Sequence, residues 1–129
     1  MTRKISILAV AVVLGACAAP TSTSTPSATA SKLPAYTGKV FVTEDKMPAG
    51  VQYEVIAKVE AKAKSGYSAG SNLYPLLADE ARKLGANAVV GVTGGRKVTL
   101  LSWAAAFVEG TAVRVDNPAD LKGLKGNSH

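Results

Sequence analysis

Apolar and polar residues alternate most clearly between Val51 and Ala63. Apolar side chains occupy every second position of this stretch, and only Ile56 breaks the alternation. A period of two over such a length predicts a β-strand with one face on a core and the other in water. The polar positions mix both charge signs, which is typical of a solvated face rather than of a docking surface.

An apolar stripe at helical spacing follows a glycine-containing loop. This stripe predicts a helix over residues 72–84. Ser71 or Asn72 can cap its N-terminus, and Pro75 is tolerated in its first turn. Gly85 supplies the left-handed residue that ends it.

Three further apolar runs predict strands at residues 39–43, 88–92 and 98–115, the last as one long strand or a pair. Gly94–Lys97 is expected to turn the chain between the second and third runs, and Gly110 to form a bulge or bend. The order of elements predicts an α+β fold, with one helix packed on a mainly antiparallel sheet of about four strands (β-β-α-β-β).

Residues 103–108 are apolar at every position. One face of a strand built from them can pack under the helix. The other face needs a cover that a single helix does not provide, so the pattern favours self-association of the domain.

The N-terminus has the form of a targeting segment. Arg3 and Lys4 precede an apolar run from Ile5 to Leu14, which is shorter than the roughly 20 residues that span a bilayer core and has the length of a signal-peptide apolar region. The run ends in Leu14-Gly15-Ala16-Cys17, which resembles the bacterial lipobox. The resemblance implies that residues 1–16 are a signal peptide and that Cys17 carries a diacylglyceryl thioether and an acylated amino group, with fatty acids such as palmitate.

Two alternatives to lipidation remain open at this point. Ala16-Cys17-Ala18 also fits an ordinary signal-peptidase site, which would release a soluble periplasmic protein, and an uncleaved anchor is the third reading. In lipoproteins of bacteria with two membranes, the residue after the cysteine directs sorting. By this resemblance, Ala18 points to an outer-membrane protein that faces the periplasm, or to a cell-membrane lipid anchor if the organism has one membrane.

Composition divides the rest of the chain into three parts. Residues 17–37 hold the lipidated cysteine and a linker rich in Ser, Thr and Pro, which is expected to be disordered. Residues 38–115 are expected to form the domain, and residues 116–129 a flexible tail. Cleavage after Ala16 removes Arg3 and Lys4 and leaves 13 basic against 9 acidic residues, a spread-out excess of +4. This excess is no basic stripe, so no nucleic-acid partner is expected.

The residues offer little material for catalysis. The chain has one cysteine and one histidine, His129, so it has neither a disulfide framework nor a Cys/His zinc site within one chain. Asp79 and Glu80 are adjacent on a helix and point about 100° apart. Lys97 follows a glycine-rich run but lacks the Ser or Thr and the helix of a phosphate loop. We therefore expect no enzyme, no cofactor and no metal site.

One weak binding site can be placed on the sequence. Gly66, Gly70 and Ser71 lead into the N-terminus of the expected helix, and Lys62 and Lys64 lie nearby. Free backbone N–H groups and the helix dipole can hold an anion at such a place. A capped loop without a ligand is the plainer alternative.

Residues 81–92, ARKLGANAVVGV, followed by GTAV at 110–113, resemble the YbjQ-like family, sometimes labelled a heavy-metal-binding domain. The resemblance implies a small α+β unit similar to dodecin subunits, often assembled into rings, in which Gly91 permits close backbone approach. A more distant similarity is to the outer-membrane sensor lipoprotein of the Rcs envelope-stress phosphorelay.

These observations lead to one expectation about function and one alternative. The first is a non-enzymatic, membrane-anchored lipoprotein whose small periplasmic domain binds protein partners or itself, in envelope maintenance or stress sensing. The alternative is an oligomeric module that binds a small ligand, an anion or a metal ion.

Overall fold

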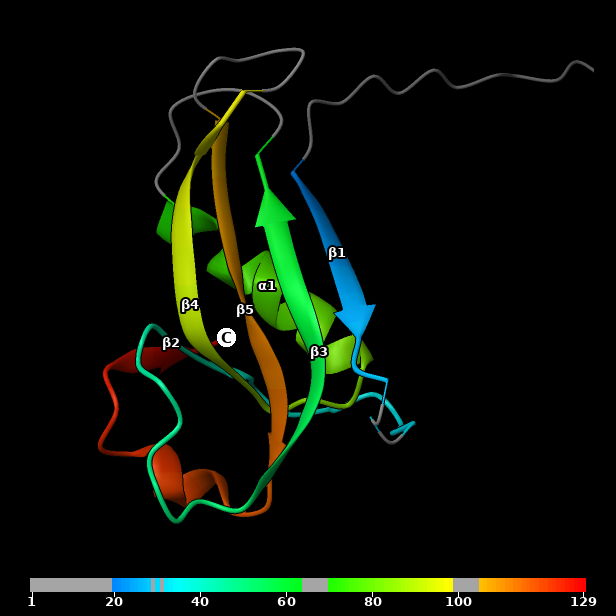
Figure 1. Cartoon of the computed structure of the whole chain (residues 1–129), viewed down its shortest axis with the longest axis vertical. Helices are drawn as coiled ribbons and strands as arrows, with labels where there is room; N and C mark the ends of the chain where they lie inside the picture. Colours follow the sequence, from blue (N-terminus) through cyan, green and yellow to red (C-terminus); the bar gives the residue numbers. More distant parts are fainter. Residues whose placement is uncertain (1–19, 29, 31, 64–69, 99–104) are drawn as a thin grey trace, which may run out of the picture.

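The computed structural model describes residues 20–28, 30, 32–63, 70–98 and 105–129. In this part of the chain, one α-helix, α1 (Tyr74–Lys83), covers one face of a mixed six-stranded sheet (Figure 1). The strands are β1 (Thr21–Pro26), β2 (Phe41–Thr43), β3 (Tyr53–Lys62), β4 (Ala88–Lys97), β5 (Ala105–Val115) and β6 (Gly126–Ser128), and two 3-10 turns are η1 (Gly70–Leu73) and η2 (Pro118–Leu121). The α+β class with one helix is confirmed.

The strand count and the strand order differ from the expectation. The sheet has the order β1-β3-β5-β4-β2-β6, in which β2 runs parallel to β4 and the other neighbours are antiparallel. The two strands missing from the expected four lie at the two edges of the sheet. Both edge strands come from segments expected to be irregular.

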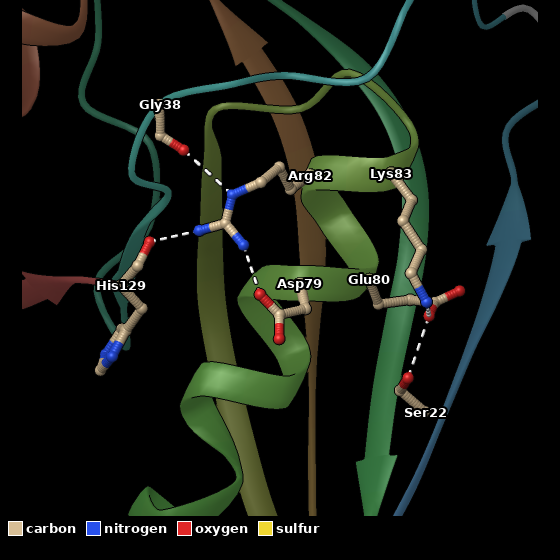
Figure 2. Close-up of polar contacts among 7 residues, drawn as sticks. All are labelled: Ser22, Gly38, Asp79, Glu80, Arg82, Lys83 and His129. Carbon is tan, nitrogen blue, oxygen red and sulfur yellow. Dashed lines mark hydrogen bonds and ion pairs between the residues drawn. The ribbon is translucent and has the colours of Figure 1, made fainter.

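β1 lies inside the segment expected to be a disordered linker. Residues 21–26 pair with residues 57–62 of β3, and the Ser27 amide donates to the Ile56 carbonyl at 2.9 Å. Ser22 and Ser24 are half-buried while the intervening threonines are exposed, and Ser22 donates to Glu80 of α1 at 2.9 Å (Figure 2). Alternating Ser and Thr without apolar residues can thus complete a sheet, because Thr favours extended backbone and the edge of β3 supplies the hydrogen bonds.

The C-terminal segment expected to be a flexible tail is part of the fold. Asn117 accepts the Ala119 amide at 3.2 Å and caps η2, which places Leu121 in the core with 2% exposure. β6 pairs with β2, and the His129 and Val40 backbones exchange hydrogen bonds at 2.9 Å. Residues 38–115 are therefore not the whole folded unit.

The same segment provides a cover for the second face of the sheet. One core cluster lies between the helix and the sheet, and it includes Leu77, Val59 and Val89. A second cluster consists of Ala88, Val90, Val113, Val115 and Leu121, with Phe41, Met47, Val51 and Leu124 packed against it. This cover lies at Val113 and Val115, whereas the expectation of self-association was drawn from residues 103–108. Of the described residues in that range, Ala106 and Val108 pack in the cluster under the helix, and self-association stays a prediction.

The break in alternation at Ile56 corresponds to a β-bulge in β3. The register between β3 and β5 shifts between Val55 and Ala57. Ile56 and Ala57 are both buried, at 3% and 1% exposure, whereas Val55 before the bulge is 41% exposed. The strand is confirmed, and from the bulge onward its faces alternate as expected, with Val59 and Ala61 in the core. Before the bulge the expectation is wrong, because Tyr53 and Val55, assigned to the core face, are 45% and 41% exposed.

Gly94–Lys97 does not form the expected turn, because these residues belong to β4 and pair with residues 105–108 of β5. The register shift between β4 and β5 lies between Val90 and Thr93, where Gly91 has a φ of +62°. Gly110, expected to form the bulge, is instead the site of close approach, since a Cβ there would lie 2.7 Å from Val89 Cγ1. The two glycines thus exchange the roles that the sequence suggested.

The N-terminus of α1 lacks the expected cap. Ser71 and Asn72 lie in η1, and the N-cap position is Leu73, which makes no side-chain capping hydrogen bond. Pro75 stands in the first turn, as expected. A 3-10 turn thus replaces a side-chain cap in leading the chain into the helix.

The C-terminus of α1 is built as expected around Gly85, which has a φ of +84°. The Gly85 and Ala86 amides donate to the Arg82 and Ala81 carbonyls, both at 3.1 Å, which is a Schellman motif. Leu33 lies on this turn, with its Cβ 2.5 Å from the place where a Cβ of residue 85 would stand. The motif therefore needs glycine both for its backbone angle and for the close approach of Leu33.

Arg82 ties the segment before β2 and the C-terminal residue to this turn. Its Nε donates to the Gly38 carbonyl at 3.0 Å, and its two terminal nitrogens donate to Asp79 and to the His129 carbonyl (Figure 2). The Tyr36 amide donates to the Arg82 carbonyl at 2.9 Å. One residue of α1 thus holds the segment before β2 and the segment after β6.

We predict that three glycine-to-alanine variants distinguish the cost of the left-handed backbone angle at Gly85 from the cost of its close contact with Leu33. Gly85→Ala should lower the free energy of unfolding by about 2–4 kcal/mol, because the left-handed angle and the contact with Leu33 both become unfavourable. Gly50→Ala, at φ +83° with no atom within 4 Å, should lose only about 1 kcal/mol. Gly123→Ala, which has neither constraint, should stay within about 0.5 kcal/mol. Urea unfolding measures all three, and equal losses at Gly85 and Gly50 would contradict the packing argument.

Candidate functional site

A cavity with a volume of about 580 Å³ lies beside the N-terminal end of α1. At this end η1 packs against β5, since a Cβ at Gly70 would lie 3.1 Å from Val108 Cγ1. The helix and the sheet that it covers are shown in Figure 1. The lining of the cavity comes from Glu44 after β2, Gly70 and Ser71 of η1, Tyr74 of α1, Val92–Arg96 of β4, and Ala106 and Val108 of β5. The floor is apolar and the rim is polar.

A carboxylate and a phenol form one wall of the cavity. The Tyr74 hydroxyl donates to Glu44 Oε1 at 3.0 Å, and the Tyr74 ring stands edge-on to the His129 ring at 6.4 Å between centroids. Burial, followed by the hydrogen bond and the charge of Glu44, raises the pKa of Tyr74 above its ordinary value. The phenol therefore stays protonated at neutral pH and acts here as a hydrogen-bond donor.

Arg96 brings a cation to the same cavity from β4. Gly94 and Gly95 precede Arg96 in β4, so this part of the cavity lining has no side chains. Both glycines are required by packing, because a Cβ at Gly94 would lie 2.8 Å from the Phe107 carbonyl and one at Gly95 would lie 2.9 Å from the Phe107 ring. The cavity thus offers a carboxylate, a phenol and a guanidinium to a ligand, but no nucleophile paired with a base.

The structure brings together only part of the anion site suggested by the sequence. Gly70 and Ser71 line the cavity. Lys62 does not: the neighbouring Ala61 and Ala63 pack towards the helix, so Lys62 lies on the other face of the sheet, where it pairs with Glu60 at 3.3 Å. Gly66 and Lys64 lie outside the described residues. Arg96, not Lys62, is the cation next to Ser71.

Cys17, the expected lipid-attachment residue, lies outside the described residues. Within the described ranges, no helix is long and apolar enough to cross a membrane. Within these ranges, no three His, Cys, Asp or Glu side chains lie together as metal ligands.

Sequence reasoning missed the structural importance of Asn87. The side chain is 5% exposed, its Nδ2 donates to the Val115 carbonyl at 2.9 Å, and its Oδ1 accepts the Val115 amide at 2.8 Å. These bonds hold the end of β5 where the second core cluster begins. A polar asparagine two residues after a helix-ending glycine, at the start of an apolar run, was the signal that could have revealed it.

Comparison of the chain with protein-family models, with curated proteins and with solved structures found no match. The functional argument for the cavity therefore rests on its geometry alone.

We predict that Tyr74 is visible in a titration of phenol absorbance. The absorbance titration of Tyr74→Phe is subtracted from that of the wild-type protein, and the difference should give a pKa for Tyr74 above the ordinary value of about 10. Glu44→Gln should lower this pKa only part of the way, because the burial of Tyr74 remains. Since the folded-state pKa is raised, the contribution of Tyr74 to stability is complete below pH about 10 and is lost as pH rises through the raised pKa. Tyr74→Phe should lack this loss at high pH. A pKa that does not respond to Glu44→Gln would contradict the assigned contact.

Proposed function

We propose that the protein is a non-enzymatic lipoprotein, anchored through acyl chains on Cys17 at the periplasmic side of the outer membrane. Its α+β domain binds an envelope protein or a second copy of itself, in envelope maintenance or stress sensing. The lipobox-like Leu14-Gly15-Ala16-Cys17 supports the anchor. The observation that carries the binding role is the open outer edge of β1.

β1 stands at the end of the sheet order, so in the described part of the chain its outer edge faces solvent. Natural edge strands are usually protected by charged side chains, by bulges or by proline. Residues 20–28 contain no charged residue, and only Pro20 and Pro26 bound the strand. Residues 21–25 between them can therefore accept an added strand from another chain, which supplies backbone hydrogen bonds.

With Cys17 lipidated as proposed, the edge of β1 lies close to the membrane. Thr21 follows Cys17 by four residues, which span at most about 14 Å when fully extended. Tethering at such a distance raises the effective concentration of the edge for a partner at the same membrane. Much of the segment expected to be a long spacer is instead used in the fold.

We further propose that the domain is related to the YbjQ-like family. The α+β class supports this, as does the role of Gly85 in ending the helix within the ARKLGANAVVGV run. The Rcs sensor lipoprotein is the more distant relative in this proposal.

The proposed function predicts site-specific cross-linking in intact cells. A photo-reactive amino acid at Thr23 of β1 should capture one identified envelope protein or a second copy, whereas the same residue at the exposed Lys122 should not. Cys17→Ala should lose the fatty-acid mass and the capture, because the edge is no longer held at the membrane. If the wild-type protein lacks the fatty-acid mass, the proposed lipid anchor on Cys17 is wrong. Acylated protein with equal capture at both positions would contradict the role of the β1 edge.

The cavity favours a second candidate function, a module that binds a small anionic ligand at Arg96, Ser71 and Tyr74. Inorganic phosphate at ten times its Kd should then raise Tm by roughly 5 °C or more. Arg96→Gln should abolish the shift and Lys122→Gln should preserve it. An unchanged Tm of the wild-type protein at high phosphate concentration would exclude phosphate as the ligand.

A further inference from the structure

We infer that one end of the sheet docks on the anionic lipid headgroups of the membrane. This end, called the anchor end below, consists of Thr21, Lys62, Arg96 and Val98. The inference rests on the proposed lipidation of Cys17 and adds which surface of the domain faces the bilayer.

The first argument is the length of chain between the lipid and the sheet. The described residues begin at Pro20 and β1 begins at Thr21, four residues after Cys17. A fully extended chain covers at most about 3.6 Å per residue. Thr21 therefore stays within about 14 Å of the Cys17 backbone at the membrane surface, whatever path the intervening residues take.

The second argument is the register of the sheet, which places basic and apolar residues beside Thr21. Thr21 pairs with Lys62, Lys62 pairs with Phe107, and Phe107 pairs with Gly95, so these residues form one row across four strands. Arg96 and Val98 follow Gly95 at the end of β4. The beginning of β1, the ends of β3 and β4 and the beginning of β5 lie together at the top of Figure 1.

The third argument is the chemistry of these side chains. The Lys62 side chain is 46% exposed, Arg96 is exposed, and Val98 is 66% exposed. Lys62 and Arg96 outweigh the single charge of Glu60, which lies 3.3 Å from Lys62. Basic residues held beside an anionic leaflet each strengthen surface binding about five-fold. The exposed valine can enter the headgroup layer beside them.

The opposite end of the sheet cannot share this contact. The 11 residues of β5 span roughly 36 Å from one end to the other. At that far end Asp116 and Asp120 accompany Lys122 and Lys125, so the acidic and basic charges of this group balance. Distance and charge both select the anchor end.

Fluorescence quenching of the full-length lipidated protein on vesicles tests this orientation. Cys17 is the only cysteine and its thiol is consumed by the lipid, so an introduced cysteine is the only free thiol. The test variant is Val98→Cys and the matched control is Ala119→Cys, an exposed position in η2 at the far end. Each variant carries a thiol-reactive fluorophore on vesicles of phosphatidylethanolamine and phosphatidylglycerol in a ratio of about three to one.

We expect lipids with spin-labelled headgroups to quench the fluorophore at residue 98 several-fold more than the one at residue 119. Iodide in the water should show the reverse order. Equal quenching of both positions would overturn the docked orientation while leaving the anchor intact. Protein that does not associate with vesicles at all and lacks acyl mass would overturn the proposed anchor and the docking with it.

Charge variants test the role of the headgroups. In the Val98→Cys background, Lys62→Gln with Arg96→Gln should reduce the docked-to-undocked ratio, read from headgroup quenching, about 25-fold. Lys122→Gln with Lys125→Gln should leave it unchanged. Vesicles of phosphatidylcholine alone should give the same reduction as the first pair of substitutions. Full quenching on phosphatidylcholine would overturn recognition of anionic lipid.

Discussion

The end of α1 is the constraint on which the rest of the structure depends. The chain must leave the helix at Gly85 in a left-handed conformation and enter β4 within three residues. Leu33 packs on the glycine, Arg82 in the last turn holds the Gly38 and His129 carbonyls, and Asn87 just after the turn holds Val115. The segment before β2, the C-terminal residue and the end of β5 are therefore positioned by one helix terminus.

This arrangement decides where the binding surfaces lie. Because the segment before β2 is fixed on the helix terminus, β1 can run along β3 and leave its own outer edge open. Because the last residues return to β2, the second core cluster is covered within the chain. The remaining exposed face of β3 carries Lys58 and Lys62 among polar neighbours, as expected of a solvated face. The open edge and the anchor end are therefore the surfaces offered to partners.

Local signals in the sequence predicted the parts of the fold that depend on neighbouring residues. The alternation between Val51 and Ala63 predicted β3, and the stripe before Gly85 predicted α1 with its end. The bulge at Ile56 was not predicted, although the break in alternation marks its place. Long-range pairing was not predictable in the same way. The polar β1 and β6 carry no apolar pattern, and Gly94 and Gly95 suggest a turn until the Phe107 backbone and ring are seen to need the space. Of the suggested anion site, Gly70 and Ser71 line the cavity and Lys62 does not, because the face on which Lys62 lies depends on the sheet.

The sequence by itself determined the α+β class, the helix, its glycine stop and the long alternating strand, since each depends on residue types or on spacing within a few positions. The tertiary structure alone decided that the supposed linker and tail are edge strands, that β2 lies parallel to β4, and that Glu44, Tyr74 and Arg96 share a cavity. These features join residues far apart in the chain. Backbone hydrogen bonds carry no side-chain signature, so pairing at the edges became visible only when the strands were assembled.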